Sequence, residues 1–349
     1  MITESVPWQK RAYIVGEIGL NHNGRVADAL RAIEIAYDAG CDAVKFQTFR
    51  AEEICVPGID YEYMSQGVSI REPQIDMFRR SELPDAAWPL CVDRAQVLGI
   101  DFFTTPQNIE DLRHFDVRKL PAIKIGSDDL TNLRMLQRIS ELGRPVILSS
   151  GMAKLADVSE ALSAVGWPVK RDVAVLVCTS EYPASLESLN LRRLSTLSGA
   201  FPGLSVGFSD HSQDLSIPAC AVALGAKIFE KHFTLDKGRA GPDHWFSANP
   251  DELHAWVQVI RNAEKSLGTG IFLPTEAESG MAEIARRSIS AVVDIPVGVK
   301  IEDSMIGMRR PGTGLSSKHW DRVIGSTARR EIGAYETISW DMLTLHHEP

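Results

Sequence analysis

The segment YIVGEIGLNHNGRVADALRAIEIAYDAGCDAVKFQTF, residues 13–49, contains one complete strand–helix–strand unit. It opens with an apolar run at 13–17 and closes with another at 43–47, as is typical of parallel strands covered on both faces. Between these runs, four apolar residues recur at the spacing of one helix face: Val26, Leu30, Ile33 and Tyr37. Gly40 follows, at the position where glycine commonly ends a helix. The segment therefore predicts a βαβ unit.

The same alternation continues to about residue 270. The strand candidates are eight apolar runs, at 13–17, 43–47, 101–105, 122–126, 146–149, 173–178, 205–209 and 227–232. The last helix opens at Asn249-Pro250, an N-cap followed by proline at the first helical position. Eight strands with crossover helices over about 250 residues predict an α/β TIM (β/α)₈ barrel rather than an open sheet. No GxGxxG motif follows the first strand, which weakens a dinucleotide-binding interpretation.

Composition changes near residue 268 and predicts three parts: a barrel domain at 1–268, a linker at 269–285 and a small β-rich domain at 286–349. Within the last part, residues 301–306 resemble residues 338–343 at an offset of 37, and Gly298 and Gly333 precede the two copies. We interpret this as a pseudo-duplicated module, with a chance match as the alternative. Residues 51–83 are too long for an ordinary βα loop and predict a lid or a dimer contact.

The overall composition is that of an ordinary globular protein. A net charge of −9 argues against a general nucleic-acid or anionic-membrane binder, so neither is expected as a partner. The N-terminal residues lack the apolar run of a signal peptide and no stretch is long enough to span a membrane, so we expect a cytoplasmic protein. The five cysteines have no CxxC spacing, which makes a disulfide framework or a structural zinc site unexpected.

Polar side chains stand at all eight predicted strand ends, where the functional groups of a barrel gather. Lys45 and Lys124 lie within apolar strands, where an unpaired ammonium is costly, so an anion must compensate them. Two interpretations remain open: a bound phosphate and carboxylate, or ion pairs with Glu17 or Glu230. Four hydroxyl groups could complete an anion site: those of Thr105, Ser127, Ser149 and Ser209.

Two histidines follow neighbouring predicted strands, and their side chains could converge. Imidazoles such as those of His211 and His232 suit divalent transition metals, although two histidines alone are a weak signal. Glu17 and Asp210 are near enough in this arrangement to supply oxygen ligands or to hold an imidazole tautomer.

An ordered set of motifs resembles the sialic acid synthase family, which includes legionaminic and pseudaminic acid synthases. The motifs are EIGLNHNG (17–24), VKFQTF (44–49), KIGSDDLTNL (124–133), ILSSGM (147–152), CTSEYPA (178–184), GFSDHS (207–212), EKHFTLD (230–236) and GPDH (241–244). The C-terminal part, with MRRPGTG at 308–314, resembles the antifreeze-like (SAF, β-clip) domain of these synthases. Single motifs are weak, but the ordered set covers nearly the whole chain.

The resemblance implies a carbon–carbon bond-forming transferase that joins phosphoenolpyruvate to an N-acetylated mannose-type sugar and releases phosphate. It implies a phosphoenolpyruvate site formed by Lys45, Thr105, Lys124, Ser127, Ser149 and Ser209. It implies sugar and catalytic positions at Glu17, Gln47, Tyr182 and Asp243. It implies that His211 and His232 bind a divalent metal, usually Mn²⁺, with Mg²⁺ or Co²⁺ as alternatives. Arg310 would be a sugar-binding arginine lent by the partner chain of a homodimer with exchanged SAF domains.

The expected mechanism places Glu17 or Asp129 as the base that activates water. Ser180 stands where bacterial sialic acid synthases commonly have asparagine, and Trp245 and Phe246 bring bulk where many relatives have small residues. The aromatic pair suits a 6-deoxy diacetamido sugar, or it packs only the rim. Two other functions stay open: a phosphoenolpyruvate synthase acting on a phosphorylated sugar, and a non-catalytic carbohydrate-binding protein.

Overall fold

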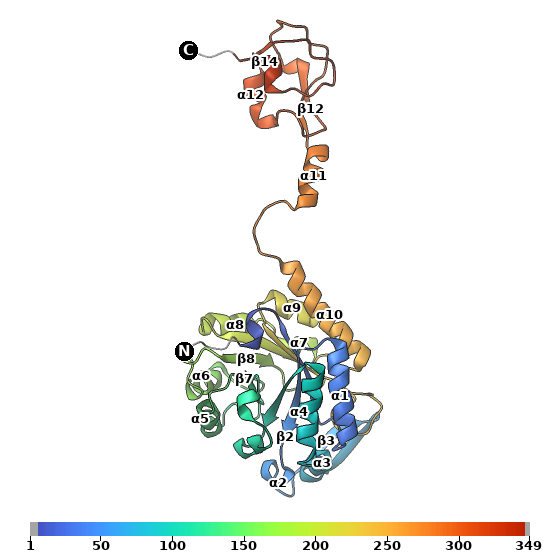
Figure 1. Cartoon of the computed structure of the whole chain (residues 1–349), viewed down its shortest axis with the longest axis vertical. Coiled ribbons are helices and arrows are strands. Elements are labelled where there is room, and N and C mark those ends of the chain that lie inside the picture. The colour runs from blue at the N-terminus through green and yellow to red at the C-terminus, as the bar shows by residue number, and fades with distance from the viewer. Residues whose placement is uncertain (1–5, 346–349) are drawn as a thin grey trace. The chain divides into compact units, whose positions relative to one another are not determined.

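The computed structural model describes residues 6–345 and divides into two compact units between Gly268 and Thr269. In the first unit, eight parallel strands are surrounded by helices (Figure 1). The strands are β1 (Tyr13–Gly19), β2 (Ala43–Thr48), β5 (Asp101–Pro106), β6 (Ile123–Ile125), β7 (Val146–Ser149), β8 (Val173–Cys178), β9 (Ser205–Asp210) and β10 (Ile228–His232). Their order is β5-β2-β1-β10-β9-β8-β7-β6, and β5 and β6 also lie in contact. The predicted α/β barrel fold is confirmed.

The helices that cover the strands follow the local signals of the sequence. They are α1 (Val26–Ala39), α4 (Ala87–Leu98), α5 (Leu133–Glu141), α6 (Leu155–Ala164), α7 (Leu186–Leu189), α8 (Arg193–Ala200), α9 (Ile217–Ala223) and α10 (Pro250–Leu267). Gly40 ends α1 in a left-handed conformation with φ of 87°. Asn249 caps α10, and its side chain accepts a hydrogen bond from the backbone N–H of Glu252. After β5, two 3₁₀ helices (Ile109–His114 and Val117–Lys119) take the place of an α-helix.

Alternation along each strand separates two cores. One set of side chains faces the helices, and the other fills the barrel interior, where Val15, Phe103, Ile147 and Ile228 are buried. The N-terminal 3₁₀ helix (Pro7–Gln9) contributes the buried Trp8 to the same interior cluster. Side chains of a strand alternate between its two faces, so every second residue points into the barrel. The polar residues at the strand ends continue these inward-facing rows. The apolar interior therefore forms the floor of a polar site.

Residues 51–83, predicted as a lid or dimer contact, form α2 (Ala51–Ile54), a hairpin of β3 (Asp60–Ser65) and β4 (Val68–Pro73), and α3 (Gln74–Ser81). The hairpin is tied to the loop after β10. Ser65 accepts a hydrogen bond from the backbone N–H of Gly241 at 3.1 Å, and Gln66 donates one to the carbonyl of Gly238 at 2.8 Å. This segment therefore borders the strand-end face of its own barrel.

The second unit has its own apolar core, which includes Ile289, Ile301, Val323 and Ile338. Its elements are α11 (Glu276–Ala285), β11 (Ser288–Ala291), β12 (Ile306–Arg309), α12 (Trp320–Val323), β13 (Thr327–Ala328), β14 (Leu343–Thr344) and 3₁₀ helices at Asp303–Met305, Ser317–His319 and Trp340–Met342. The predicted linker thus contains a helix, α11, with no buried residue.

The predicted internal repeat is present in the backbone. The 3₁₀ helices Asp303–Met305 and Trp340–Met342 are related by the 37-residue offset, and each is followed at once by a strand. The same offset relates Gly298, with φ of 82°, to Tyr335, with φ of 71°. A left-handed backbone costs a residue with a side chain about 1–2 kcal/mol. Tyr335 is 71% exposed, so burial of its ring does not offset that cost.

Candidate functional site

The strand ends on one side of the barrel hold a cluster of buried charges. The inward rows end in Glu17 on β1, Lys45 on β2, Lys124 on β6 and Glu230 on β10, each at most 4% exposed. Lys45 Nζ lies 2.9 Å from Glu17 Oε2 and 3.7 Å from Glu230 Oε2. Lys124 Nζ lies 3.7 Å from Glu230 Oε1. The ion pairs raised as an alternative from the sequence are therefore present, and Glu230 joins both lysines.

Hydroxyl groups extend this charge cluster. Thr105 Oγ1 accepts a hydrogen bond from Lys45 Nζ at 2.8 Å, and Ser209 Oγ donates one to Glu230 Oε1 at 3.0 Å. Gln47 Nε2 donates a weaker hydrogen bond to Glu17 Oε1 at 3.3 Å. Ser209 and Gln47 are thereby joined directly to the two carboxylates, and Thr105 is joined to them through Lys45. From the sequence, Glu230 was considered only as an ion-pair partner of the lysines, although its place at a strand end was a signal for a role in the site.

The pKa values of the two carboxyl groups move in opposite directions. Burial raises the pKa of Glu17 to about 7, and the attraction of Lys45 only partly opposes it. Burial also acts on Glu230, but Lys124 and Lys45 outweigh it and lower the pKa of Glu230 to about 2. Burial lowers the pKa of Lys124. Pairs of carboxyl groups separated in this way are typical of sites that move protons, with Glu17 suited to exchange one near neutral pH.

A second group of hydroxyls lies around Gly151. Ser127 Oγ accepts a hydrogen bond from the backbone N–H of Gly151 at 3.0 Å. A Cβ at this glycine would come within 2.3 Å of Ser180 Oγ and 2.6 Å of Ser127 Oγ, so the three residues are packed closely. The Oγ atom of Ser149, which is buried at the end of β7, has no hydrogen-bond partner among residues 6–345. An unpartnered buried hydroxyl next to buried lysines indicates a place for a hydrogen-bonding ligand.

His211 and His232 are brought together as predicted, with ring centroids 5.4 Å apart. Tyr182 lies against both rings, at centroid distances of 4.2 Å and 5.9 Å, and Phe246 covers Tyr182 at 5.0 Å. Asp243 lies beyond them, with Oδ2 3.9 Å from His232 Nδ1, and burial raises its pKa to about 6. The five side chains form one wall of the site.

The two histidines offer ring nitrogens to a metal. His211 Nδ1 lies 2.7 Å from the carbonyl of Thr179, so it donates there and leaves Nε2 toward the site. His232 Nδ1 is buried and forms no hydrogen bond with the described residues, and burial, aided by His211, lowers the pKa of His232 well below its ordinary value. Burial lowers the pKa of His211 too, but Cys178, together with the Thr179 carbonyl and Glu230, outweighs burial and raises the pKa above its ordinary value. Within residues 6–345, no three His, Cys, Asp or Glu side chains are grouped to hold a metal.

A buried ion pair lies directly behind these histidines. Asp210 and Lys231, which precede His211 and His232 in the chain, meet with Lys231 Nζ 3.1 Å from Asp210 Oδ2. Trp256 of α10 donates a hydrogen bond to the same carboxylate oxygen at 2.8 Å. The backbone N–H of Ser212 donates to the other oxygen, at 2.9 Å. This network fixes the two strand ends relative to one another and to α10.

Two predicted residues lie away from the charge cluster. Asp129 accepts a hydrogen bond from Asn132 at 2.9 Å in the turn before α5. Its neighbour Asp128 interacts electrostatically with Lys45. Burial lowers the pKa of Lys45, but Glu17, Glu230 and, more weakly, Asp128 raise that pKa and outweigh burial. Arg310 belongs to the second unit, where it is exposed and makes no hydrogen bond or ion pair with the described residues.

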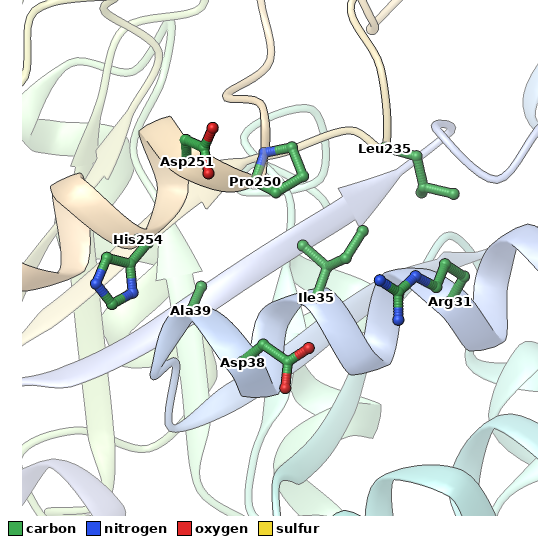
Figure 2. Close-up of a pocket in the computed structure, with 8 residues that line it drawn as sticks. All are labelled: Arg31, Ile35, Asp38, Ala39, Leu235, Pro250, Asp251 and His254. Atoms are coloured by element: carbon green, nitrogen blue, oxygen red, sulfur yellow. The ribbon is translucent and has the colours of Figure 1, made fainter.

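A pocket of about 490 Å³ lies on the outside of the barrel, between α1 and α10. Figure 2 shows Arg31, Ile35 and Asp38 on α1 opposite Asp251 and His254 on α10. None of the strand-end residues lines it. It is therefore separate from the site described above.

Comparison with known proteins places this geometry in a family. Residues 32–272 match the NeuB family, and residues 286–344 match the SAF domain. The chain is 36% identical to N,N'-diacetyllegionaminic acid synthase of Campylobacter jejuni, over 94% of this chain and 99% of that one. It is also 36% identical to the synthase of the same name from Legionella pneumophila, over 94% of each chain. The crystal structure of N-acetylneuraminic acid synthetase from Leptospira borgpetersenii matches with a TM-score of 0.69 and 32% identity, over 78% of this chain and 91% of that chain.

The described residues include no helix with the length and apolar character needed to cross a membrane.

A barrel with buried lysines and carboxylates at its strand ends agrees with the family match, which covers most of the barrel and the small domain. The chain therefore belongs to the NeuB family, is a carbon–carbon bond-forming transferase of the nonulosonic acid synthase type, and carries a C-terminal SAF domain.

Proposed function

We propose that this chain condenses phosphoenolpyruvate with the open-chain form of an N-acetylated, mannose-type amino sugar. The products are a nonulosonic 2-keto acid and inorganic phosphate. The observation that supports this most is the set of two lysines and two carboxyl groups, all buried, at the strand ends of a NeuB-family barrel. Buried ammonium groups of this kind stabilise a small, highly charged anion because little water competes with them.

Phosphoenolpyruvate is expected to occupy the side of the site that holds Lys124 and the serines around Gly151. Lys45 and Lys124 supply positive charge, and Ser149 offers a hydroxyl that has no partner in the described part of the chain. Ser127, Thr105 and Ser209 complete the set of hydrogen-bonding groups. Both lysines interact with the phosphate before and after the reaction, so part of their effect is ground-state binding.

In the chemical step, the enol carbon of phosphoenolpyruvate attacks the sugar aldehyde and forms the new carbon–carbon bond. Water adds to the cationic C2, and Glu17 accepts the proton that this water loses. Breakage of the C2–O bond then releases phosphate and leaves the 2-keto acid, and the two protons of the water end on the former aldehyde oxygen and on the phosphate. Glu17 suits this role because its pKa is about 7 and because Gln47 donates a hydrogen bond to its Oε1 atom, which holds the carboxyl group in place. Asp129, hydrogen-bonded within its own turn, is the less favoured base.

A divalent metal, Mn²⁺ or alternatively Mg²⁺ or Co²⁺, would be held by His211 and His232, with further positions left for water and substrate oxygen. Such an ion supplies Lewis-acid polarisation of the aldehyde when bound. Tyr182 covers both imidazoles and restricts their orientation. Asp243 is placed to bind a sugar hydroxyl or an ordered water next to His232.

The acceptor is expected to be a 2,4-diacetamido-6-deoxy sugar rather than N-acetylmannosamine. Phe246 packs on Tyr182 and within 5.6 Å of the His232 ring centroid, so an apolar surface reaches the acceptor side. Similarity to two N,N'-diacetyllegionaminic acid synthases points the same way. Ser180, beside Gly151, leaves more room than a larger amide side chain would.

Phosphate release from phosphoenolpyruvate, measured over a panel of N-acyl amino sugars, tests the proposal. The panel contains N-acetylmannosamine, its 6-phosphate and the 6-deoxy diacetamido sugar, each with and without a chelator. Phosphate release with the diacetamido sugar alone supports both the proposed reaction and the proposed acceptor sugar. Release only with the phosphorylated sugar would show that the acceptor is a sugar phosphate. Absence of release with every sugar and metal would leave the binding-protein alternative.

The site is completed, in this proposal, by Arg310 from the partner chain of a domain-exchanged homodimer. Arg310 is exposed and has no partner within the described part of its own chain, so its guanidinium is available. Mixing an Arg310→Ala chain with a His211→Ala chain should restore activity, because one site of each heterodimer then has both residues. Inactive mixtures that do form heterodimers would exclude sharing between chains.

A further inference from the structure

Tyr335 has a backbone conformation that residues with a side chain rarely adopt. Its φ of 71° lies in the left-handed region, and Gly298, its counterpart in the internal repeat, has φ of 82°. A Cβ at Gly298 would meet no atom within 4 Å, so both positions are open turns where glycine is the residue of least strain. A tyrosine kept in such a turn, with 71% of its surface exposed, is not explained by packing.

The ring of Tyr335 contacts a charged side chain. The guanidinium of Arg309 lies over the ring, 4.9 Å from its centroid. Both residues are tied to the end of β11: the backbone N–H of Tyr335 donates to the carbonyl of Ala291 at 2.9 Å, and Arg309 Nη1 approaches the same carbonyl at 3.4 Å. Within residues 6–345 no carboxylate forms an ion pair with Arg309, so its guanidinium is held by the Tyr335 ring and the Ala291 carbonyl.

Arg309 is also the last residue of β12 and pairs with Ser288 of β11. Arg310 follows at once and begins the turn that leads to Gly312, whose backbone N–H donates to the carbonyl of Glu283 at 2.7 Å. Arg310, between these two anchors, is exposed, and its side chain makes no hydrogen bond or ion pair with residues 6–345. Its direction therefore depends on how firmly Arg309 is held.

We propose that Tyr335 is a positioning residue for Arg310: its ring holds Arg309 at the end of β12 and thereby orients the exposed guanidinium that follows. This inference rests on the proposed role of Arg310 at the acceptor sugar. Tyr335 accordingly affects sugar binding rather than phosphoenolpyruvate binding. Glycine at this position would relieve the strain but would provide no ring.

Three full-length variants separate this role from a structural one. Tyr335→Phe keeps the ring, Tyr335→Leu keeps a side chain with similar strain but removes the aromatic face, and Tyr335→Gly removes both ring and strain. We expect Leu and Gly to raise KM for the sugar about two- to fivefold, the range of an exposed cation–π contact, with kcat and KM for phosphoenolpyruvate unchanged. Phe should match the unaltered protein, and Gly should not lower the unfolding midpoint.

The interaction between the two residues is tested by a double-mutant cycle. Arg309→Met should raise KM for the sugar as Tyr335→Leu does, and the double variant should show no further increase. A lower unfolding midpoint in Tyr335→Gly with unchanged KM would show a structural role and overturn the inference. An equal rise of KM in Phe and Leu would indicate direct contact by the hydroxyl and also overturn it.

Amide hydrogen exchange in residues 307–312 gives a readout that needs no turnover. Exchange should be faster in the Leu variant than in the unaltered protein, and unchanged in Phe. Equal exchange in all three proteins refutes the positioning role even if the enzyme is active. If the unaltered protein shows no turnover with any sugar, the proposed function fails, while the exchange result still decides whether Tyr335 restrains this turn.

Discussion

Replacement of Glu230 by glutamine tests the charge arrangement at the strand ends. Glu230 lies 3.7 Å from each of Lys45 and Lys124, and two unit charges at that distance attract by about 4.5 kcal/mol at an effective dielectric constant of 20. Desolvation offsets most of the two attractions. Removing one partner from a buried ionic cluster costs about 3–5 kcal/mol, because the remaining charges are left uncompensated. We expect a loss of that size in the free energy of unfolding of Glu230→Gln near pH 7.

The pH dependence of this loss follows from the pKa of Glu230, which lies at about 2 in the folded protein, below its ordinary value of 4.5. A lowered folded pKa contributes stability that is present above about pH 4.5 and disappears as the pH falls through 2. The difference between Glu230→Gln and the unaltered protein should therefore be present above about pH 4.5 and shrink below it. Glu187→Gln, an exposed change on α7, serves as the matched control.

Urea denaturation at several pH values, with and without phosphoenolpyruvate, measures the effect. An anion near Lys45 and Lys124 replaces part of the lost negative charge, so phosphoenolpyruvate should raise the unfolding midpoint of Glu230→Gln more than that of the unaltered protein. Equal stability of the two proteins at pH 7 would refute the argument that Glu230 compensates both lysines. Equal stabilisation by phosphoenolpyruvate would place its binding elsewhere.

Three further predictions follow from the same geometry. Glu17→Gln should remove the limb of the pH profile of kcat/KM near pH 7, and an unchanged profile would contradict the proton role of Glu17. The same change should increase the free energy of unfolding above pH 7, because a raised folded pKa contributes stability that is lost as the pH rises through about 7. Ser149→Ala should leave the unfolding midpoint unchanged, since the hydroxyl has no partner among the described residues, but it should raise KM for phosphoenolpyruvate about tenfold. The exposed change Ser163→Ala serves as the control. Asp210→Asn, which weakens the pair with Lys231 behind the histidines, should lower the affinity for Mn²⁺ measured by calorimetry about tenfold or more; unchanged affinity in a folded variant would mean that this network does not hold the imidazoles.

The repeating pattern of the chain was sufficient for the barrel and for much of its site. Apolar runs separated by amphipathic helices predict eight parallel strands, and the period of two then decides that Glu17, Lys45 and Lys124 lie on the inward rows. Strand ends meet on one face, so the proximity of His211 and His232 also follows from local pattern. The 37-residue repeat similarly predicts the paired 3₁₀ helices of the second unit.

Partners across strands depend on register and closure, which no local pattern contains. The tertiary structure alone shows that Glu230 joins both lysines and that Asp210, Lys231 and Trp256 support the histidines from behind. It also shows Asp129 bonded within its own turn. The physical reason is that burial and charge act over distances between residues remote in the chain. The sequence therefore determines which residues face the site, and the fold determines which of them interact and how their pKa values separate.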